Sequence, residues 1–195
     1  MGSTCPGAQA NGLGNHMHSL DASGKRVLET ERLWLRPLEF ADEDALFAVF
    51  GDPVVMEWFP KVRTREEVRE GIERNCQRFA EDGTGLLGVV LKETGELVGD
   101  CGPVRQEVES RMEIEIGYHL RRDQWNRGLA TEAARACMQY AYESLGAESL
   151  ISMIRPENLP SRRVAEKNGL TLEKLVFWRN YDHCIYRAVR YRDLP

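Results

Sequence analysis

The feature that most constrains the fold is a stretch in which a strand-like pattern changes into a helix-like one. Over residues 113–120 apolar and polar side chains alternate, which is the period of a strand with two unlike faces. After Gly128 the apolar positions recur at helical spacing in an alanine-rich stretch that ends near Gly146. A strand, a tight turn and a long helix predict a fold in which helices pack against a sheet.

The turn between this strand and this helix is a candidate anion site. The first N–H groups of a helix have no partner inside the helix and carry partial positive charge. Small residues at the turn, Gly128 above all, let these groups point at one spot, which suits a phosphate. We therefore expect the turn to hold the diphosphate of a coenzyme. Most turns of this kind bind nothing. The prediction of a coenzyme site therefore also requires that flanking segments of the chain fit the same ligand.

The rest of the chain predicts one α/β (α+β) domain, residues 27–195, after a flexible tail, residues 1–26. Strand patterns occur at residues 26–37, 86–91, 97–104, 113–120, 149–154, 171–178 and 183–190, with a polar turn at 107–110. Helical patterns occur at residues 41–50, 64–80, 129–145 and 161–167. The predicted order is β-α-α-β-β-β-α-β-α-β-β. A GxGxxG match at residues 83–88 follows a helix and precedes a strand, the reverse of a dinucleotide site, and is rejected.

Composition narrows the class of protein. A net charge of −5 argues against nonspecific binding to nucleic acid. No apolar run approaches the roughly 20 residues that cross a bilayer, so we expect no membrane partner. The five cysteines are scattered without a CxxC pair, which predicts reduced thiols and a cytoplasmic location. No metal is assigned, and a monomer or a homodimer is expected.

Three blocks of the sequence resemble the GNAT superfamily of acyl-CoA N-acyltransferases. The family pattern Gln/Arg-x-x-Gly-x-Gly/Ala aligns with residues 125–130, where Trp125 replaces Gln or Arg. That departure is usual in the branch of ribosomal-protein N-terminal acetyltransferases (Rim-like). The chain resembles this branch in three blocks, which are residues 117–120 with 125–133, residues 158–170 and residues 31–38. The resemblance covers residues 28–190. It implies a GNAT fold: a central, mixed, mostly antiparallel sheet of about seven strands with flanking helices.

The resemblance also implies a cosubstrate, acetyl-CoA, and an acceptor, a primary amine. The acceptor is either a protein N-terminus or a small-molecule amine, and the branch resemblance favours the former. Main-chain groups of three residues are expected to bind the pantetheine arm: Tyr118, His119 and Leu120. Amides of five residues are expected to hold the diphosphate: Arg127, Gly128, Leu129, Ala130 and Thr131. Asn158 is expected to hydrogen-bond to the pantetheine.

Catalysis by such an enzyme needs a proton acceptor for the amine and an acid for the departing thiolate. Glu115 is the favoured base, with Glu113 in reserve, and the alternative is that both are surface carboxylates. His119 on the same strand face could also serve as the base, although its main chain is the part expected to meet the pantetheine arm. Many GNAT enzymes place a Tyr where this chain has Ala165, so the resemblance implies Ser161 as the acid. The alternative is that Ser161 and Asn158 only cap a helix.

Three other interpretations compete with this one. A covalent route through Cys101 or Cys137 is disfavoured, because neither has a neighbouring histidine in the sequence. The rival from another class is a noncatalytic module that binds acyl-CoA without turnover. A phosphate-transferring enzyme is disfavoured, because no Gly-Lys-Ser/Thr loop occurs.

Overall fold

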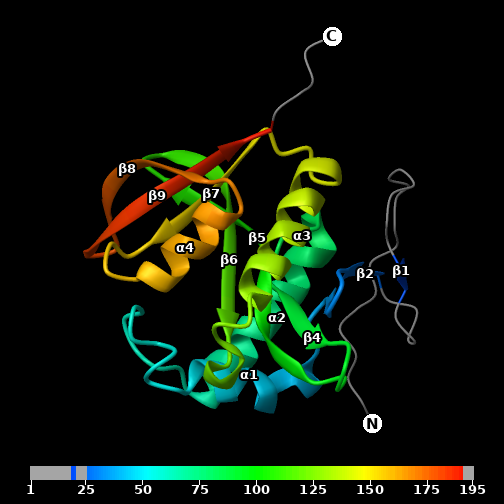
Figure 1. Cartoon of the computed structure of the whole chain (residues 1–195). Helices are drawn as coiled ribbons and strands as arrows, with labels where there is room; N and C mark the ends of the chain where they lie inside the picture. The colour runs from blue at the N-terminus through cyan, green and yellow to red at the C-terminus, as the bar shows by residue number, and fades with distance from the viewer. Residues whose placement is uncertain (1–18, 21–25, 191–195) are drawn as a thin grey trace.

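The computed structural model describes residues 19–20 and 26–190, which form one sheet with flanking helices (Figure 1). The strands are β1 (Ser19–Leu20), β2 (Arg26–Glu29), β3 (Leu33–Arg36), β4 (Leu87–Leu91), β5 (Leu97–Val108), β6 (Arg111–Leu120), β7 (Ser149–Ile154), β8 (Thr171–Trp178) and β9 (Tyr181–Val189). The helices are α1 (Glu43–Phe50), α2 (Arg65–Asp82), α3 (Leu129–Glu143) and α4 (Leu159–Lys167). Across the sheet the order is β1-β2-β3-β4-β5-β6-β7-β9-β8. This arrangement confirms the predicted fold class.

The first predicted strand, residues 26–37, is two strands, so the prediction of one continuous strand is wrong. β2 and β3 pair antiparallel, with Leu28 opposite Leu35. Thr30 closes the turn between them, because its N–H donates to the carbonyl of Leu33 and its hydroxyl accepts from the N–H of Leu33. This turn contains neither glycine nor proline, so the sequence gives no sign of it.

Two apolar cores lie on opposite faces of the sheet. Along β4, Val89 and Leu91 contribute to the core under α3 and α4, whereas Val90 contributes to the core under α1 and α2. This division is what the alternation of side chains along a strand produces. α2 begins at the predicted capping box, in which Thr64 and Glu67 exchange hydrogen bonds between side chain and main chain.

One neighbouring pair of strands, β6 and β7, runs parallel and separates almost at once. The other neighbouring pairs among the described strands are antiparallel, while β6 and β7 share a single register position, Glu115 opposite Ile151. Figure 1 shows β6 upright and β7 leaving it at an angle. We call the diverging segments, residues 115–120 of β6 and 151–154 of β7, the fork. α3 follows the end of β6 and α4 follows the end of β7, so both helices begin near its open end.

The β5–β6 hairpin is longer than the polar segment 107–110 predicts. β5 continues to Val108, so that only Glu109 and Ser110 form the turn. Both have positive φ, 50° and 63°, which is the geometry of a two-residue hairpin turn. Val108 is buried in a small apolar cluster with side chains of β7, β8 and β9. This tertiary contact extends the hairpin past the polar residues.

α4 begins at Leu159 rather than at the predicted Ser161. Pro160 is compatible with the first turn of a helix, because the N–H that it lacks would have no partner there. Asn158 is the N-cap residue. The helix ends before Gly169, whose φ of 82° is the left-handed conformation that the predicted Asn-Gly stop requires.

The predicted flexible tail, residues 1–26, lies outside the described residues except for residues 19–20 and 26. A single domain over residues 27–195 stays a prediction. Within the described part of the chain, no helix has the length and apolar character needed to cross a membrane.

Candidate active site

Glu115 lies at the closed end of the fork. The N–H of Met153 on β7 donates to Glu115 Oε1 at 3.3 Å, and the hydroxyl of Ser152 donates to the carbonyl oxygen of Ile116 at 3.0 Å. These side-chain contacts replace the ladder hydrogen bonds that diverging strands no longer make. The Glu115 carboxyl group is thereby fixed where β6 leaves β7.

Burial raises the pKa of Glu115 to about 7. The hydrogen bond from Met153 and the electrostatic interactions with His119 and Arg179 oppose this shift without offsetting it. A carboxyl group that titrates near neutrality is suited to accept a proton from a substrate.

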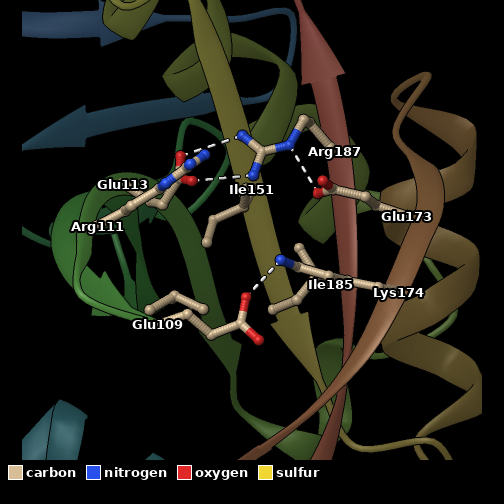
Figure 2. A pocket seen from close by; sticks show the side chains of 9 residues that line it. Glu109, Arg111, Glu113, Ile151, Glu173, Lys174, Ile185 and Arg187 are labelled. Atoms are coloured by element: carbon tan, nitrogen blue, oxygen red, sulfur yellow. Dashed lines mark hydrogen bonds and ion pairs between the residues drawn. The ribbon is translucent and has the colours of Figure 1, made fainter.

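Glu113, on the same strand face, is held in an ion pair instead. Arg187 donates from Nη1 and Nη2 to the two carboxylate oxygens of Glu113, at 3.1 and 3.0 Å, and from Nε to Glu173 at 2.7 Å. Figure 2 shows these pairs in the wall of a cavity of about 290 Å³. The hydrogen bonds from Arg187 lower the pKa of Glu113. Of the two carboxyl groups, Glu115 is therefore the better proton acceptor.

The edge of β6 that faces the fork carries the main-chain groups of alternate residues. The carbonyl of Ile116 faces the fork because it accepts from β7, so alternation places the main-chain groups of Tyr118 and Leu120 on the same edge. The carbonyl of His119 faces β5, since a Cβ added to Gly99 would lie 2.0 Å from this oxygen. The main-chain role predicted for His119 therefore does not fit the fork, whereas that of Tyr118 does. Leu120 offers its N–H there, because its carbonyl already accepts from Trp125 Nε1 at 2.8 Å.

Ser161 meets the phenol of Tyr118, a contact that the sequence interpretation missed. The Tyr118 hydroxyl donates to the Ser161 carbonyl oxygen at 2.9 Å and accepts from the Ser161 hydroxyl at 3.0 Å. Burial raises the pKa of Tyr118, so the phenol stays protonated. Asn158 Oδ1 accepts from the N–H of Ser161 at 3.2 Å. The capping alternative thus holds for Asn158, whereas the Ser161 hydroxyl bonds to β6.

The turn before α3 keeps its main-chain donors open. Asn126 and Gly128 have φ of 59° and 78°, two left-handed residues in a short loop. Gly128 is the N-cap of α3, and no side chain caps this helix. The N–H of Glu132 donates to the carbonyl of Gly128 at 3.1 Å, so the N–H groups of residues 129–131 precede the first helical hydrogen bond. This is the arrangement expected of an anion site.

Arg32, to which the sequence interpretation gave no role, lies beside this turn. Its guanidinium donates to the carbonyl of Arg127 at 2.9 Å and pairs with Glu132 at 2.6 Å. Thr30 donates to the same Glu132 carboxylate at 2.5 Å. These contacts tie the first turn of α3 to the β2–β3 turn. The side chain of Arg127 donates to Gln124 Oε1 at 2.6 Å, so one of its N–H groups is used within the turn.

The cysteines considered for a covalent route are buried in the core under α3. Cys101 and Cys137 are both 0% exposed, and burial raises the pKa of Cys101, which keeps its thiol protonated. This environment is that of an inert core residue. Over the described residues, no three or more His, Cys, Asp or Glu side chains come together as a metal site.

A comparison with protein families identifies this arrangement. The family model described as "Acetyltransferase (GNAT) domain" matches residues 32–171, which span β3 to the first residue of β8. The chain belongs to the GNAT family of acetyltransferases. The elements that form the fork and the turn before α3 lie within the match. This GNAT domain is an N-acetyltransferase, as the three sequence blocks implied.

Individual GNAT relatives support the assignment. The uncharacterized N-acetyltransferase p20 of Bacillus licheniformis is 31% identical over 165 residues, covering 84% of this chain and 91% of the relative. The crystal structure of an acetyltransferase from Agrobacterium tumefaciens has a TM-score of 0.74 and 30% identity, covering 92% and 100% of the two chains. The ribosomal L7/L12 acetyltransferase RimL in complex with coenzyme A has a TM-score of 0.69 at 18% identity, covering 84% and 97%, which shows a shared fold.

Proposed function

We propose that this enzyme transfers an acetyl group from acetyl-CoA to a primary amine by direct attack of the amine on the thioester. The observation that carries the proposal is Glu115, a carboxyl group with a pKa of about 7 at the closed end of the fork. An alkyl ammonium group has a pKa about three units above neutrality, so presenting it uncharged costs roughly 4 kcal/mol. Glu115 is the group that accepts this proton, directly or through a water molecule.

The residues around the fork fit acetyl-CoA. The open N–H groups of residues 128–131 and the nearby guanidinium of Arg32 suit a diphosphate. The main-chain groups of Tyr118 and the N–H of Leu120 suit the amides of a pantetheine arm, which would add to the edge of β6 like a strand. Asn158 uses Oδ1 for its cap and keeps Nδ2 for the same arm. When bound, the coenzyme supplies the activated acyl carbon.

Ser161 is the proposed donor of the proton that the departing thiolate needs. Its hydroxyl lies at the start of α4, next to the open end of the fork, and is hydrogen-bonded to the phenol of Tyr118. Tyr118 stays protonated because burial raises its pKa, and its two hydrogen bonds to Ser161 hold the Ser161 hydroxyl in place beside the fork. Ala165, where many relatives have a Tyr, is buried in the core and offers no acid.

The acceptor is a primary amine on either a protein N-terminus or a small molecule. The RimL structure belongs to a protein whose name refers to an alpha-N-protein acceptor, and the shared fold favours the same class here. The decisive test is a calorimetric titration with acetyl-CoA followed by an assay of thiol release. The amine panel comprises peptides with free N-termini, a polyamine and an aminoglycoside.

Thiol release with one class of amine would support the proposal and identify the acceptor. Binding of acetyl-CoA without thiol release from any amine would overturn it in favour of a noncatalytic acyl-CoA-binding module. A burst of acetylated enzyme before amine is added would overturn direct attack.

A further inference from the structure

A buried pair of ionisable side chains lies on the same face of β6 as Glu115 and has no part in the mechanism so far. Asp100 on β5 is the register partner of His119 on β6, and Asp100 Oδ1 lies 2.8 Å from His119 Nδ1. The Asp100 side chain is 2% exposed and the His119 side chain 12% exposed. A carboxylate removed from water needs such a partner. The pairing fixes one nitrogen of the imidazole.

Two aromatic side chains fix the plane of the imidazole ring. The rings of Phe50 and Phe59 lie 5.0 and 5.1 Å from the ring of His119, the former edge-on. Phe59 also lines a cavity of about 300 Å³ beside the segment that joins α1 to α2. Nε2 of His119 has no hydrogen-bond partner in the described part of the chain. When Nδ1 carries the proton that it donates to Asp100, Nε2 is left as a hydrogen-bond acceptor.

His119 and Glu115 flank a position without a side chain. Alternation places Glu115, Gly117 and His119 on one face of β6, with the outer two Cα atoms about 13 Å apart. A Cβ added to Gly117 would meet one described atom within 4 Å, Cδ2 of Leu86 at 3.4 Å. Gly117 therefore places no side chain between the two polar ones, and an amine held over Gly117 would lie between them.

Acetylation of an ammonium group removes two protons from its nitrogen. The bond between nitrogen and the acetyl carbon forms, the bond between carbon and sulfur breaks, one proton goes to the thiolate and one is released. Two protons leaving one nitrogen are best served by two acceptors on different sides of it. Glu115 provides one acceptor, and the Nε2 atom of His119 is placed to provide the other.

We propose that His119 is a second catalytic residue, whose Nε2 binds the acceptor amine opposite Glu115, and that Asp100 is its positioning residue. This inference rests on the proposed function and extends it to the amine site. Phe59 contacts the imidazole and lines the cavity of about 300 Å³, so this is the side from which we propose that the amine enters. The gap that opens between β6 and β7 remains the place of the coenzyme.

The test compares His119→Asn, Asp100→Asn and Asp42→Asn in the full-length enzyme with the best amine of the panel. Asn at position 119 keeps a donor for Asp100 but lacks Nε2, so kcat/KM for the amine should fall about 100-fold while KM for acetyl-CoA stays within about twofold. Asp100→Asn should lower the same ratio about tenfold, because the ring loses its orientation. Asp42, also buried and paired with Arg36 at 2.7 Å, is the matched control. Asp42→Asn should lower the melting temperature and leave both kinetic constants unchanged.

A second variant separates chemistry from structure. His119→Ala leaves a space beside Phe50 and Phe59 that free imidazole fits, so added imidazole should restore part of the activity. Wild-type kcat/KM for the amine in His119→Asn would overturn the inference, as would a loss in His119→Ala that imidazole does not reverse. If the wild-type enzyme acetylates no amine, the proposed function itself fails. That outcome is seen with the wild-type enzyme alone, so it is distinct from a failure of the inference about His119.

Discussion

Glu115 holds a carboxyl group at the closed end of the fork, where burial raises its pKa to about 7. Glu115→Gln removes the proton acceptor but keeps an oxygen for the N–H of Met153. We expect kcat to fall at least about 100-fold, with KM for acetyl-CoA unchanged, in a thiol-release assay. Glu113→Gln is the matched control: it breaks the pair with Arg187, so it should lower the melting temperature and change kcat less than about threefold.

The same pKa predicts how rate and stability depend on pH. The rate of the wild-type enzyme should rise as Glu115 loses its proton, with a midpoint near pH 7, and Glu115→Gln should lack this step. Since the pKa of Glu115 in the folded protein lies above the ordinary glutamate value of 4.5, the carboxylate destabilises the fold increasingly from about pH 4.5 to 7. Glu115→Gln should therefore raise the free energy of unfolding at pH 8 by up to about 3 kcal/mol. A less stable variant at pH 8 would contradict the burial argument.

Ser161 separates catalysis from capping, because its N–H takes part in the cap and its hydroxyl does not. Ser161→Ala should slow turnover about 10- to 100-fold while the affinity for acetyl-CoA and the melting temperature change little. Asn158→Ala should instead remove the cap and lower the free energy of unfolding by about 1 kcal/mol. A Ser161→Ala variant with lowered melting temperature and normal turnover would show that the hydroxyl is structural.

At the scale of an element, the proposed binding of the diphosphate at the start of α3 depends on the backbone conformation of Gly128. Gly128→Glu would place a negative side chain at the open N–H groups and strain a residue with φ of 78°. We expect the calorimetric dissociation constant of acetyl-CoA to rise at least about 100-fold, or about 3 kcal/mol. Gly146→Glu is the control, because Gly146 also has a positive φ, 67°, and lies beyond the C-terminal end of α3. No described atom lies within 4 Å of a Cβ added there. It should share the strain and keep the affinity.

Local sequence patterns predicted the strands and helices. The contacts that the sequence did not predict depend on how distant segments pair and pack. The alternation in β6 and the small residues before α3 are local, so the strand, the turn and the helix could be predicted from the sequence. The pair of Asp100 and His119 depends on the register of β5 against β6, which no spacing reveals. The contact of Tyr118 with Ser161 depends on how α4 sits over the fork. The ion pair of Glu113 likewise requires β9 beside β7.

At the scale of the whole molecule, the sheet consists of two halves that meet at one parallel register position. A ligand in the fork would contact both halves, so acetyl-CoA at 100 times its dissociation constant should add about 2.7 kcal/mol to the free energy of unfolding. For a domain of this size that corresponds to about 5–11 °C in melting temperature. Hydrogen exchange in β7 and α4 should slow at the same time. An equal shift in Gly128→Glu would place the ligand elsewhere.

Thr30 and Arg32 brace the first turn of α3 across 102 and 100 positions of the chain. The family match begins at residue 32 and ends at residue 171, so it leaves out Thr30 and the whole of β9. A recombinant fragment trimmed to residues 32–171 would retain the matched family sequence. It would lose the hydrogen bond from Thr30 to Glu132 in the first turn of α3, and it would lose β9, the strand between β7 and β8. Expression boundaries for this enzyme should accordingly be drawn from its hydrogen bonds and strand pairing, upstream of residue 30 and downstream of residue 189.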